Sequence, residues 1–378
     1  MHPHPRRRGN LYRLFEGNRE YWDHNGTRPD ARAAVHRALL CRTTNLGAEV
    51  YSSPSGEEHI FYHTCKSRAC NSCGYWQTIR WQREVSSQLP EIPYVGVILT
   101  LHPDLWEIFR GNRHLLRALP ALGAGALSDW AKERYKAEIP VLTVLHTFNA
   151  KLGFYPHLHV VAGLTGLYLD GNSLVTGIHF PRDLILERWR KAVLDLLGNA
   201  VRRARCHSAM RREQLHRAIA YHRTLQWIVR IKQKHNKEAI LNYNARYLRR
   251  PPIGEHRIIH FDRHCVRFQF NDKQDENRVH ECELPTKEFI SRLLDHIPDR
   301  RLHGVRYSGL LSPRSRHARY RTFLRLLGKL KPQKVRRMRW RTSVRQTFGT
   351  DPLLDSGESP LTWSHRLPPC SHPDQRAP

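Results

Sequence analysis

The sequence has no apolar run long enough to cross a membrane. Its longest apolar stretches, Tyr94 to Leu101 and Val160 to Leu169, are interrupted and strand-sized, whereas a membrane-spanning helix needs about 18 or more apolar residues. The first ten residues, MHPHPRRRGN, lead into no apolar signal-peptide core either. We therefore expect a cytoplasmic protein that has no membrane partner.

Acidic residues are scarce relative to basic ones. The chain has 34 Asp and Glu against 63 Lys and Arg, which gives a formal net charge of +29. An excess of this size indicates a polyanionic partner, most often nucleic acid and less often an anionic membrane surface. The composition, 40% hydrophobic and 26% charged over 378 residues, predicts a folded chain with two or three domains and excludes a disordered basic tail.

Eight cysteines in a chain of this length are too few for a disulfide framework. In a reducing compartment, clustered cysteines are typical of metal ligands or buried thiols. Half of them lie within residues 1–82, a segment with many aromatic residues and little strand periodicity. We expect this segment to be a small module supported by a metal, with the candidate ligands Cys41, Cys65, Cys70 and Cys73.

From residue 92 onward the pattern alternates between strands and helices. Apolar runs predict buried strands at 92–101, 141–150 and 156–164. Apolar residues at helical spacing predict helices over 103–135 and 184–197. The fold class that these elements indicate is α+β.

The second half of the chain continues this alternation. We expect a strand at 225–232, a helix over 236–250 and an antiparallel pair formed by 257–270 and 278–284. Beyond Ser312 the chain is strongly basic and then rich in Pro and Ser, without periodicity. We expect about the last thirty residues to be poorly ordered.

Two histidines, His157 and His159, stand two residues apart in a predicted strand. Alternate residues of a strand point to one side, so both imidazoles could bind a single metal ion. In isolation the pair is a weak signal, because roughly 1.6 His-x-His pairs are expected by chance with 25 histidines. Two imidazoles on a polar strand face remain the alternative interpretation.

Two tyrosines, Tyr243 and Tyr247, stand four residues apart in a predicted helix and therefore share one of its faces. A stripe of core tyrosines is the alternative. The neighbouring residues Arg246, Arg249 and Arg250 make a dry core improbable and suit the binding of phosphate groups.

The histidine pair and the tyrosine pair together indicate one kind of chemistry. A divalent metal held by two histidines and a third polar ligand polarises a phosphodiester, and a tyrosine hydroxyl attacks its phosphorus. The product is a phosphotyrosine and a free sugar hydroxyl. Because the covalent link stores the bond energy, a strand can be nicked, held and rejoined without ATP.

These residues resemble those of the HUH (His-hydrophobic-His) rolling-circle transposases, specifically the two-tyrosine insertion-sequence ninety-one family. The resemblance extends over residues 41 to about 312 in family order. The residues that carry it are Cys41-Arg42-Thr43, Leu46-Gly47, Cys65, Arg68, Cys70, Cys73, His146-Thr147, His157 to His159, Trp227, Lys232, Tyr243 to Arg250, Glu288-Phe289, Arg292, His296, Pro298, Arg306-Tyr307 and Gly309-Leu310.

The resemblance implies an HUH-endonuclease-like antiparallel sheet with flanking helices, preceded by a small Cys-rich, zinc-ribbon-like N-terminal module. It implies a transposase that nicks and rejoins single-stranded DNA at the ends of its own mobile element, in the bacterial nucleoid, through a 5′-phosphotyrosine. His157 and His159 would bind catalytic Mg²⁺ or Mn²⁺, Tyr243 and Tyr247 would be the nucleophiles, and Zn²⁺ would be structural.

The resemblance also implies a domain organisation. We expect an N-terminal Cys-rich DNA-binding module at 1–82, followed by an HUH nuclease domain with the catalytic tyrosine helix at 83–255. A strand and helix part would follow at 256–312, and a basic, partly disordered tail at 313–378.

The chain departs from the family pattern at its metal sites. Where a Cys-x-x-Cys is usual it has Ser52 to Ser55, and a second such motif is replaced around Asp355 to Glu358, which leaves Cys370 isolated. The four remaining cysteines, with His59 or His63, could still bind zinc. The usual third catalytic ligand, a Gln, aligns with Ala150; our candidates for that role are His146 and then Asn149.

Two rival functions remain open. A plasmid replication initiator or relaxase shares the same chemistry but acts on an origin. A catalytically decayed transposase, or another basic DNA-binding protein, would show salt-sensitive DNA affinity and form no covalent product.

Overall fold

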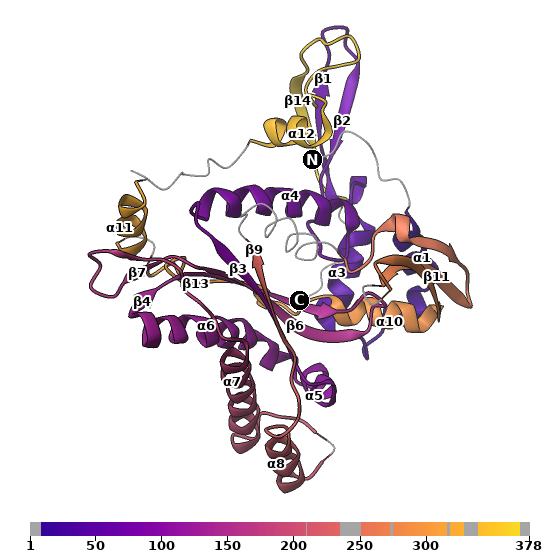
Figure 1. Ribbon diagram of the computed structural model, residues 1–378. Helices are drawn as coiled ribbons and strands as arrows, with labels where there is room; N and C mark the ends of the chain where they lie inside the picture. The colour runs from indigo at the N-terminus through magenta and orange to yellow at the C-terminus, as the bar shows by residue number, and fades with distance from the viewer. Residues whose placement is uncertain are drawn as a thin grey trace.

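A five-stranded antiparallel sheet forms the centre of the molecule (Figure 1). The computed structural model describes residues 9–208, 210–234, 251–272, 275–315, 318–328 and 339–370. The strand order is β13-β5-β6-β3-β9, so β6 lies in the middle of the sheet. In that order the strands are β13 (Val305–Gly309), β5 (Pro140–Phe148), β6 (Phe154–Gly163), β3 (Tyr94–Thr100) and β9 (Val229–Lys234).

The three strands predicted between residues 92 and 164 are confirmed as β3, β5 and β6. The strand predicted at 225–232 begins later, at Val229, because Trp227 precedes the sheet and is buried in the core. The helix predicted over 236–250, which includes both tyrosines and the three arginines after them, lies outside the described residues.

One face of the sheet is mainly apolar and is covered by helices. On β6 this face consists of Leu158, Val160 and Ala162, all buried. The helix predicted over 103–135 is interrupted in the structure, where one α-helix ends at Gly111 and the next begins at Leu119. The elements on this side are η2 (Pro103–Leu105), α5 (Trp106–Gly111), η3 (Arg113–Arg117), α6 (Leu119–Tyr135), α7 (Arg182–Arg202) and α8 (Arg212–Tyr221).

The opposite face changes from apolar to polar along its length. Near Val144 and Val161 it packs against α4 (Asn71–Gln88) and α11 (Arg319–Leu326). Because side chains alternate, the next residues of β6 on this face are His159 and then His157. Figure 1 shows α4 on one side of the sheet and α6 and α7 on the other.

The N-terminal segment shares a core with the part of the chain beyond residue 251. Val35, Phe268 and Phe289 belong to this one apolar cluster, together with the four N-terminal cysteines. In addition, α4 crosses residue 82, where the sequence predicts the first domain boundary. The elements of this unit are α1 (Asn10–Gly17), α2 (Arg19–Trp22), α3 (Pro29–Leu39), η1 (Thr44–Leu46), η4 (Glu255–Arg257), β10 (Ile258–Phe261), β11 (Cys265–Asp272), β12 (Arg278–Pro285) and α10 (Thr286–His296).

The C-terminal part differs from the expectation of poor order. Residues 362–367 form β14 (Thr362–Leu367), which pairs with β1 (Ala48–Ser52) beside β2 (Glu58–Tyr62), and α12 (Trp340–Phe348) precedes them. Glu49 of β1 accepts hydrogen bonds from Trp363 Nε1 at 3.0 Å and Arg366 Nε at 2.8 Å. The bond from Trp363 contributes most to lowering the pKa of Glu49, so the carboxylate stays ionised and retains both contacts.

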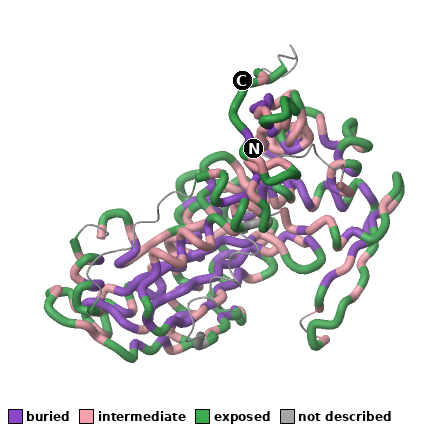
Figure 2. The backbone as a smooth tube through the Cα atoms, turned by 90° about the horizontal axis from the view of Figure 1, so that it is seen from above, coloured by how far each residue is buried: buried purple, intermediate pink, exposed green. Residues whose placement is uncertain are grey.

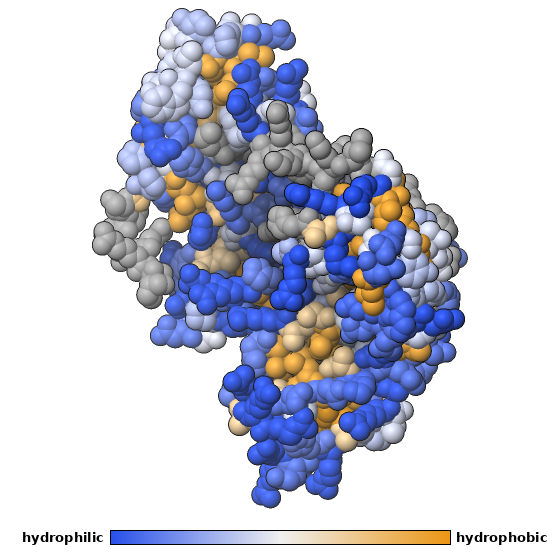
Figure 3. Space-filling view, turned by 90° about the vertical axis from the view of Figure 1, so that its left-hand side faces the viewer, coloured by the Kyte–Doolittle hydropathy of each residue, from blue (hydrophilic) through white to orange (hydrophobic). Residues whose placement is uncertain are grey.

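A further small sheet, composed of buried and partly buried residues, lies outside these units. It contains β4 (Ala137–Glu138), β7 (Gly166–Tyr168) and β8 (Leu174–Val175). Buried residues concentrate in the central strands, and the hairpin tips are exposed (Figure 2). Hydrophilic residues cover most of the surface seen in Figure 3, with apolar residues gathered in a few patches. Among the described helices, none combines the length and apolar character that a bilayer requires.

The contact of α6 with the sheet depends on a glycine. A Cβ at Gly123 would collide with the Leu158 side chain and lie 3.2 Å from Leu99 Cδ1, and both leucines are fully buried. We expect Gly123→Ala to destabilise the protein by about 1–3 kcal/mol through overpacking. Gly198→Ala in α7 is the matched control, because nothing lies within 4 Å of its Cβ position, and we expect it to stabilise by up to about 1 kcal/mol. Denaturant unfolding of both variants checks this; equal effects would contradict the packing argument.

Candidate metal centres

Three histidines meet on the polar part of the central sheet. His146 of β5 stands directly opposite His157 of β6, and His159 is the next residue of β6 on the same face. Their residues are 4%, 8% and 5% exposed, respectively. The pairing register alone brings the three imidazoles together, because directly opposed residues of antiparallel strands point to the same side.

The ring nitrogens are spaced as ligands of one ion would be. The Nε2 atoms of His157 and His159 are 3.1 Å apart, and adjacent ligands at about 2.1 Å from an octahedral metal are separated by about 3.0 Å. The ring of His146 lies 4.3 Å from that of His159 and 5.2 Å from that of His157, centroid to centroid. His157 donates from Nδ1 to the Tyr155 carbonyl at 2.8 Å, which leaves the Nε2 lone pair for a metal.

A fourth histidine holds the strand end that carries His146. His296 donates from Nε2 to the Leu152 carbonyl at 2.8 Å, and its Nδ1 accepts from the Thr147 hydroxyl at 3.2 Å. Burial lowers the pKa of His296 to about 4, so its imidazole is neutral at pH 7 and can make both bonds. His296 therefore holds Thr147, the neighbour of the candidate ligand His146, without adding a charge to the site.

The alternative third ligands lie elsewhere. Asn149 uses its side-chain oxygen to accept from the amides of Lys151 at 3.0 Å and Gly153 at 2.9 Å, so it forms the turn between β5 and β6. Ala150, which takes the family's Gln position, is exposed in that turn. Of the two candidates for this position, the structure brings His146 and not Asn149 to the histidine pair.

Residues to which the sequence analysis assigned no site role also reach this face. Tyr155 packs its ring 4.8 Å from that of His157, and burial raises the pKa of its hydroxyl. Arg230 and Lys232 of β9 are exposed and pair with Ile98 and Gly96 of β3, so they point to the histidine side. The alternation of residues within the predicted strand 225–232 could have shown that these two cations share one face of the strand.

Two hollows flank this face among the described residues, and both are lined by Arg68. His146, Phe148 and Pro251 also line the first hollow. Trp81 and Tyr307 also line the second. The hollows that flank the histidine site are therefore lined by Arg68 and by aromatic rings that include those of Phe148, Trp81 and Tyr307.

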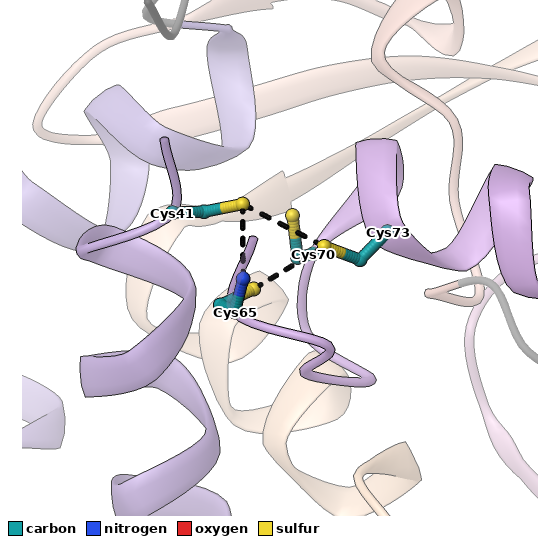
Figure 4. A group of neighbouring side chains, drawn as sticks. All are labelled: Cys41, Cys65, Cys70 and Cys73. Carbon is teal, nitrogen blue, oxygen red and sulfur yellow. Dashed lines mark hydrogen bonds between the residues drawn. The ribbon is translucent and has the colours of Figure 1, made fainter. Parts of the chain in front are cut away.

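The four N-terminal cysteines form a second centre (Figure 4). Cys41 follows α3, Cys65 lies in the loop after β2, Cys70 precedes α4, and Cys73 is in its first turn. Cys73 Sγ lies 3.6 Å from Cys41 Sγ and 3.5 Å from Cys65 Sγ. A tetrahedral Zn²⁺ with bonds of about 2.3 Å places its sulfurs about 3.8 Å apart, so the cluster fits this ion.

Backbone amides support this arrangement. The Ser67 amide donates to Cys65 Sγ at 3.3 Å, and the Cys65 amide donates to Cys41 Sγ at 3.5 Å. Contacts among the four thiols lower the pKa values of Cys41 and Cys70 and raise those of Cys65 and Cys73.

The two histidines that the sequence suggested as further zinc ligands do not join the cysteines. His63 contacts the Leu46 carbonyl at 2.9 Å and Glu49 at 3.3 Å, and neither His63 nor His59 belongs to the cysteine group. Ser53, within the replaced motif, accepts from the Glu57 amide at 3.0 Å and so closes the β1–β2 turn. The four cysteines therefore supply a complete tetrahedral set by themselves.

Replacing one cysteine should remove the metal from this centre. We expect Cys65→Ser to lose one zinc per chain and to melt at a lower temperature, because three buried thiolates bind zinc poorly. Cys206→Ser is the control, since Cys206 is only partly buried and lies outside the cluster. Elemental analysis and thermal melting measure both effects. Unchanged zinc in Cys65→Ser would rule out the site.

Comparisons with known proteins relate both centres to one family. A family described as "Transposase zinc-binding domain" matches residues 14–101, which include all four cysteines, and one described as "Putative transposase" matches residues 141–319, which include the three histidines. No solved structure matches the chain.

Two relatives match most of the chain. The "Transposase for insertion sequence element IS801" of Pseudomonas savastanoi pv. phaseolicola is 31% identical over 323 residues, which cover 80% of this chain and 76% of the relative. The "Putative transposase y4qJ" of Sinorhizobium fredii is 28% identical over 337 residues, with 85% and 83% covered. The chain therefore belongs to the IS91 family of transposases.

Proposed function

We propose that this transposase nicks and rejoins single-stranded DNA at the ends of its own element through a 5′-phosphotyrosine. The observation that supports this most directly is the convergence of His146, His157 and His159 on one face of the sheet. A buried group of three imidazoles beside exposed cations suits a metal-assisted reaction of a phosphodiester.

The three histidines would hold the catalytic ion. When bound, a divalent cation supplies Lewis-acid polarisation of the phosphoryl oxygens. Imidazole donors suit first-row transition ions better than Mg²⁺, which prefers oxygen ligands, so of the two candidate cofactors the donor set favours Mn²⁺.

Tyr243 and Tyr247 are the proposed nucleophiles. The phenolic oxygen of one forms a bond to phosphorus as the bond from phosphorus to the 3′ oxygen breaks. The phenol loses its proton, the departing 3′ oxygen gains one, and the 5′ phosphate stays on tyrosine. Rejoining reverses these steps: a second 3′ hydroxyl attacks the phosphotyrosine and releases the phenol. The other tyrosine could hold another strand during this exchange.

One end of the segment that carries these tyrosines is consistent with this role. The segment follows Lys234, the last residue of β9, which pairs with Tyr94 at the end of the sheet away from the histidines. The chain is described again from Pro251, which lines the same hollow as His146. The described chain therefore resumes, after the tyrosines, at the border of the histidine face.

DNA would be held on the same face. Arg230 and Lys232 would bind phosphates. Arg246, Arg249 and Arg250, which the sequence predicts to bind phosphates as well, lie outside the described residues. Tyr307, next to Arg68 in the second hollow, would offer its ring to an unpaired base. The zinc module would recognise or position the ends of the element.

A denaturing gel tests the covalent step. Purified protein is incubated with Mn²⁺ and labelled single-stranded oligonucleotides from both flanks of its gene. We expect a protease-sensitive, slowly migrating band that disappears in His157→Ala and in at least one of Tyr243→Phe and Tyr247→Phe, a loss of at least about 100-fold.

Tyr155→Phe is the matched control for this experiment. It removes a tyrosine hydroxyl next to His157 while keeping the ring, and burial disfavours ionisation of that hydroxyl. We expect the band to persist. If Tyr155→Phe alone removes it, the nucleophile is misassigned; binding of every flank without attachment would favour a DNA-binding protein that has lost catalysis.

A further inference from the structure

A third group of metal-ligating side chains lies outside both centres described above. It consists of His102 and Asp104, at the loop that follows β3, and His222, directly after α8. We propose that these three residues form a separate binding site for a borderline divalent cation, Zn²⁺ in the first instance. The proposal is independent of the nuclease chemistry, because it uses none of the residues assigned to it.

His222 has the arrangement of a metal-bound histidine. The residue is 6% exposed, and its Nδ1 donates to the Ala218 carbonyl at 2.7 Å. This bond fixes the tautomer, so Nε2 carries the lone pair and the ring orientation is set. Among the described residues, no hydrogen bond reaches His222 Nε2, although the atom is buried. A buried acceptor left in this state costs free energy unless a ligand binds it.

The other two donors lie where that nitrogen points. Asp104 Oδ2 is 3.6 Å from His222 Nε2 and 3.4 Å from His102 Nδ1. These are too long for good hydrogen bonds but match the separation of about 3.4 Å between ligands of a tetrahedral ion with bonds of about 2.1 Å. His102 Nδ1 also accepts a long hydrogen bond from the Asp104 amide at 3.4 Å, and an ion would take this lone pair in place of the amide.

The donor set indicates the kind of ion. Two imidazoles and one carboxylate are typical of zinc sites that leave a fourth position open to water or another ligand. The Asp104 side chain is 63% exposed, so an ion can enter from solvent. Once bound, it would tie the connection between α8 and β9 to the loop after β3, next to the buried Trp227, which donates to the His222 carbonyl at 3.1 Å.

The test is the zinc content of the full-length protein after saturation with zinc and dialysis into metal-free buffer. We expect His222→Gln to retain one zinc per chain fewer than the wild type, and Asp104→Asn to lose zinc from this site at least about tenfold more readily in competition with a chelating dye. His216→Gln is the control, because His216 lies on the same helix and belongs to no ligand group among the described residues. It should match the wild type.

Two results would overturn the proposal. If His222→Gln retains as much zinc as the wild type, the three residues form only an ion pair. If His216→Gln loses the same amount, the loss reflects general surface binding by histidines. Should circular dichroism show that His222→Gln is misfolded, Asp104→Asn decides, because this exposed side chain can change without disturbing the core. Neither result depends on whether the protein attaches to DNA.

Discussion

The register between β5 and β6 is the constraint on which the histidine centre depends. His146 meets His157 only because these two residues are directly opposite, and a slip of β6 by one residue would turn His157 and His159 to the helix-covered face. The apolar alternation of Leu158, Val160 and Ala162 opposes such a slip, since it would expose these side chains and bury polar ones. Packing on one face of the sheet thus sets the chemistry on the other.

Much of this arrangement could be predicted from sequence, and the failures have physical causes. The strand that carries His157 and His159 follows from its apolar alternation, and the cysteine group from its spacing. The choice of His146 over Asn149 needed the register, which the strand pattern alone does not specify. The strand at Thr362–Leu367 could not be foreseen, because all but the last of its residues are exposed and it forms only by pairing with β1.

The structure shows what replaces the two cysteine motifs that are missing from this chain. Where the resemblance leads one to expect two Cys-x-x-Cys motifs, this chain forms two turns closed by side-chain oxygens. Ser53 accepts from one backbone amide, and Asp355 Oδ1 accepts from Gly357 and Ser359 at 2.9 and 2.8 Å. Both turns belong to the unit in which β14 pairs with β1, and hydrogen bonds stabilise them in place of metal–cysteine bonds. The four remaining cysteines still form a complete set of metal ligands.

The contact between Glu49 and Trp363 joins residues 314 positions apart. A ribosome that has released β1 and β2 must therefore synthesise nearly the whole chain before the third strand of that sheet exists. The N-terminal sheet is therefore begun early and completed only after every strand of the central sheet has been synthesised. Synthesis and assembly of this module are thereby linked in time by the order of its strands.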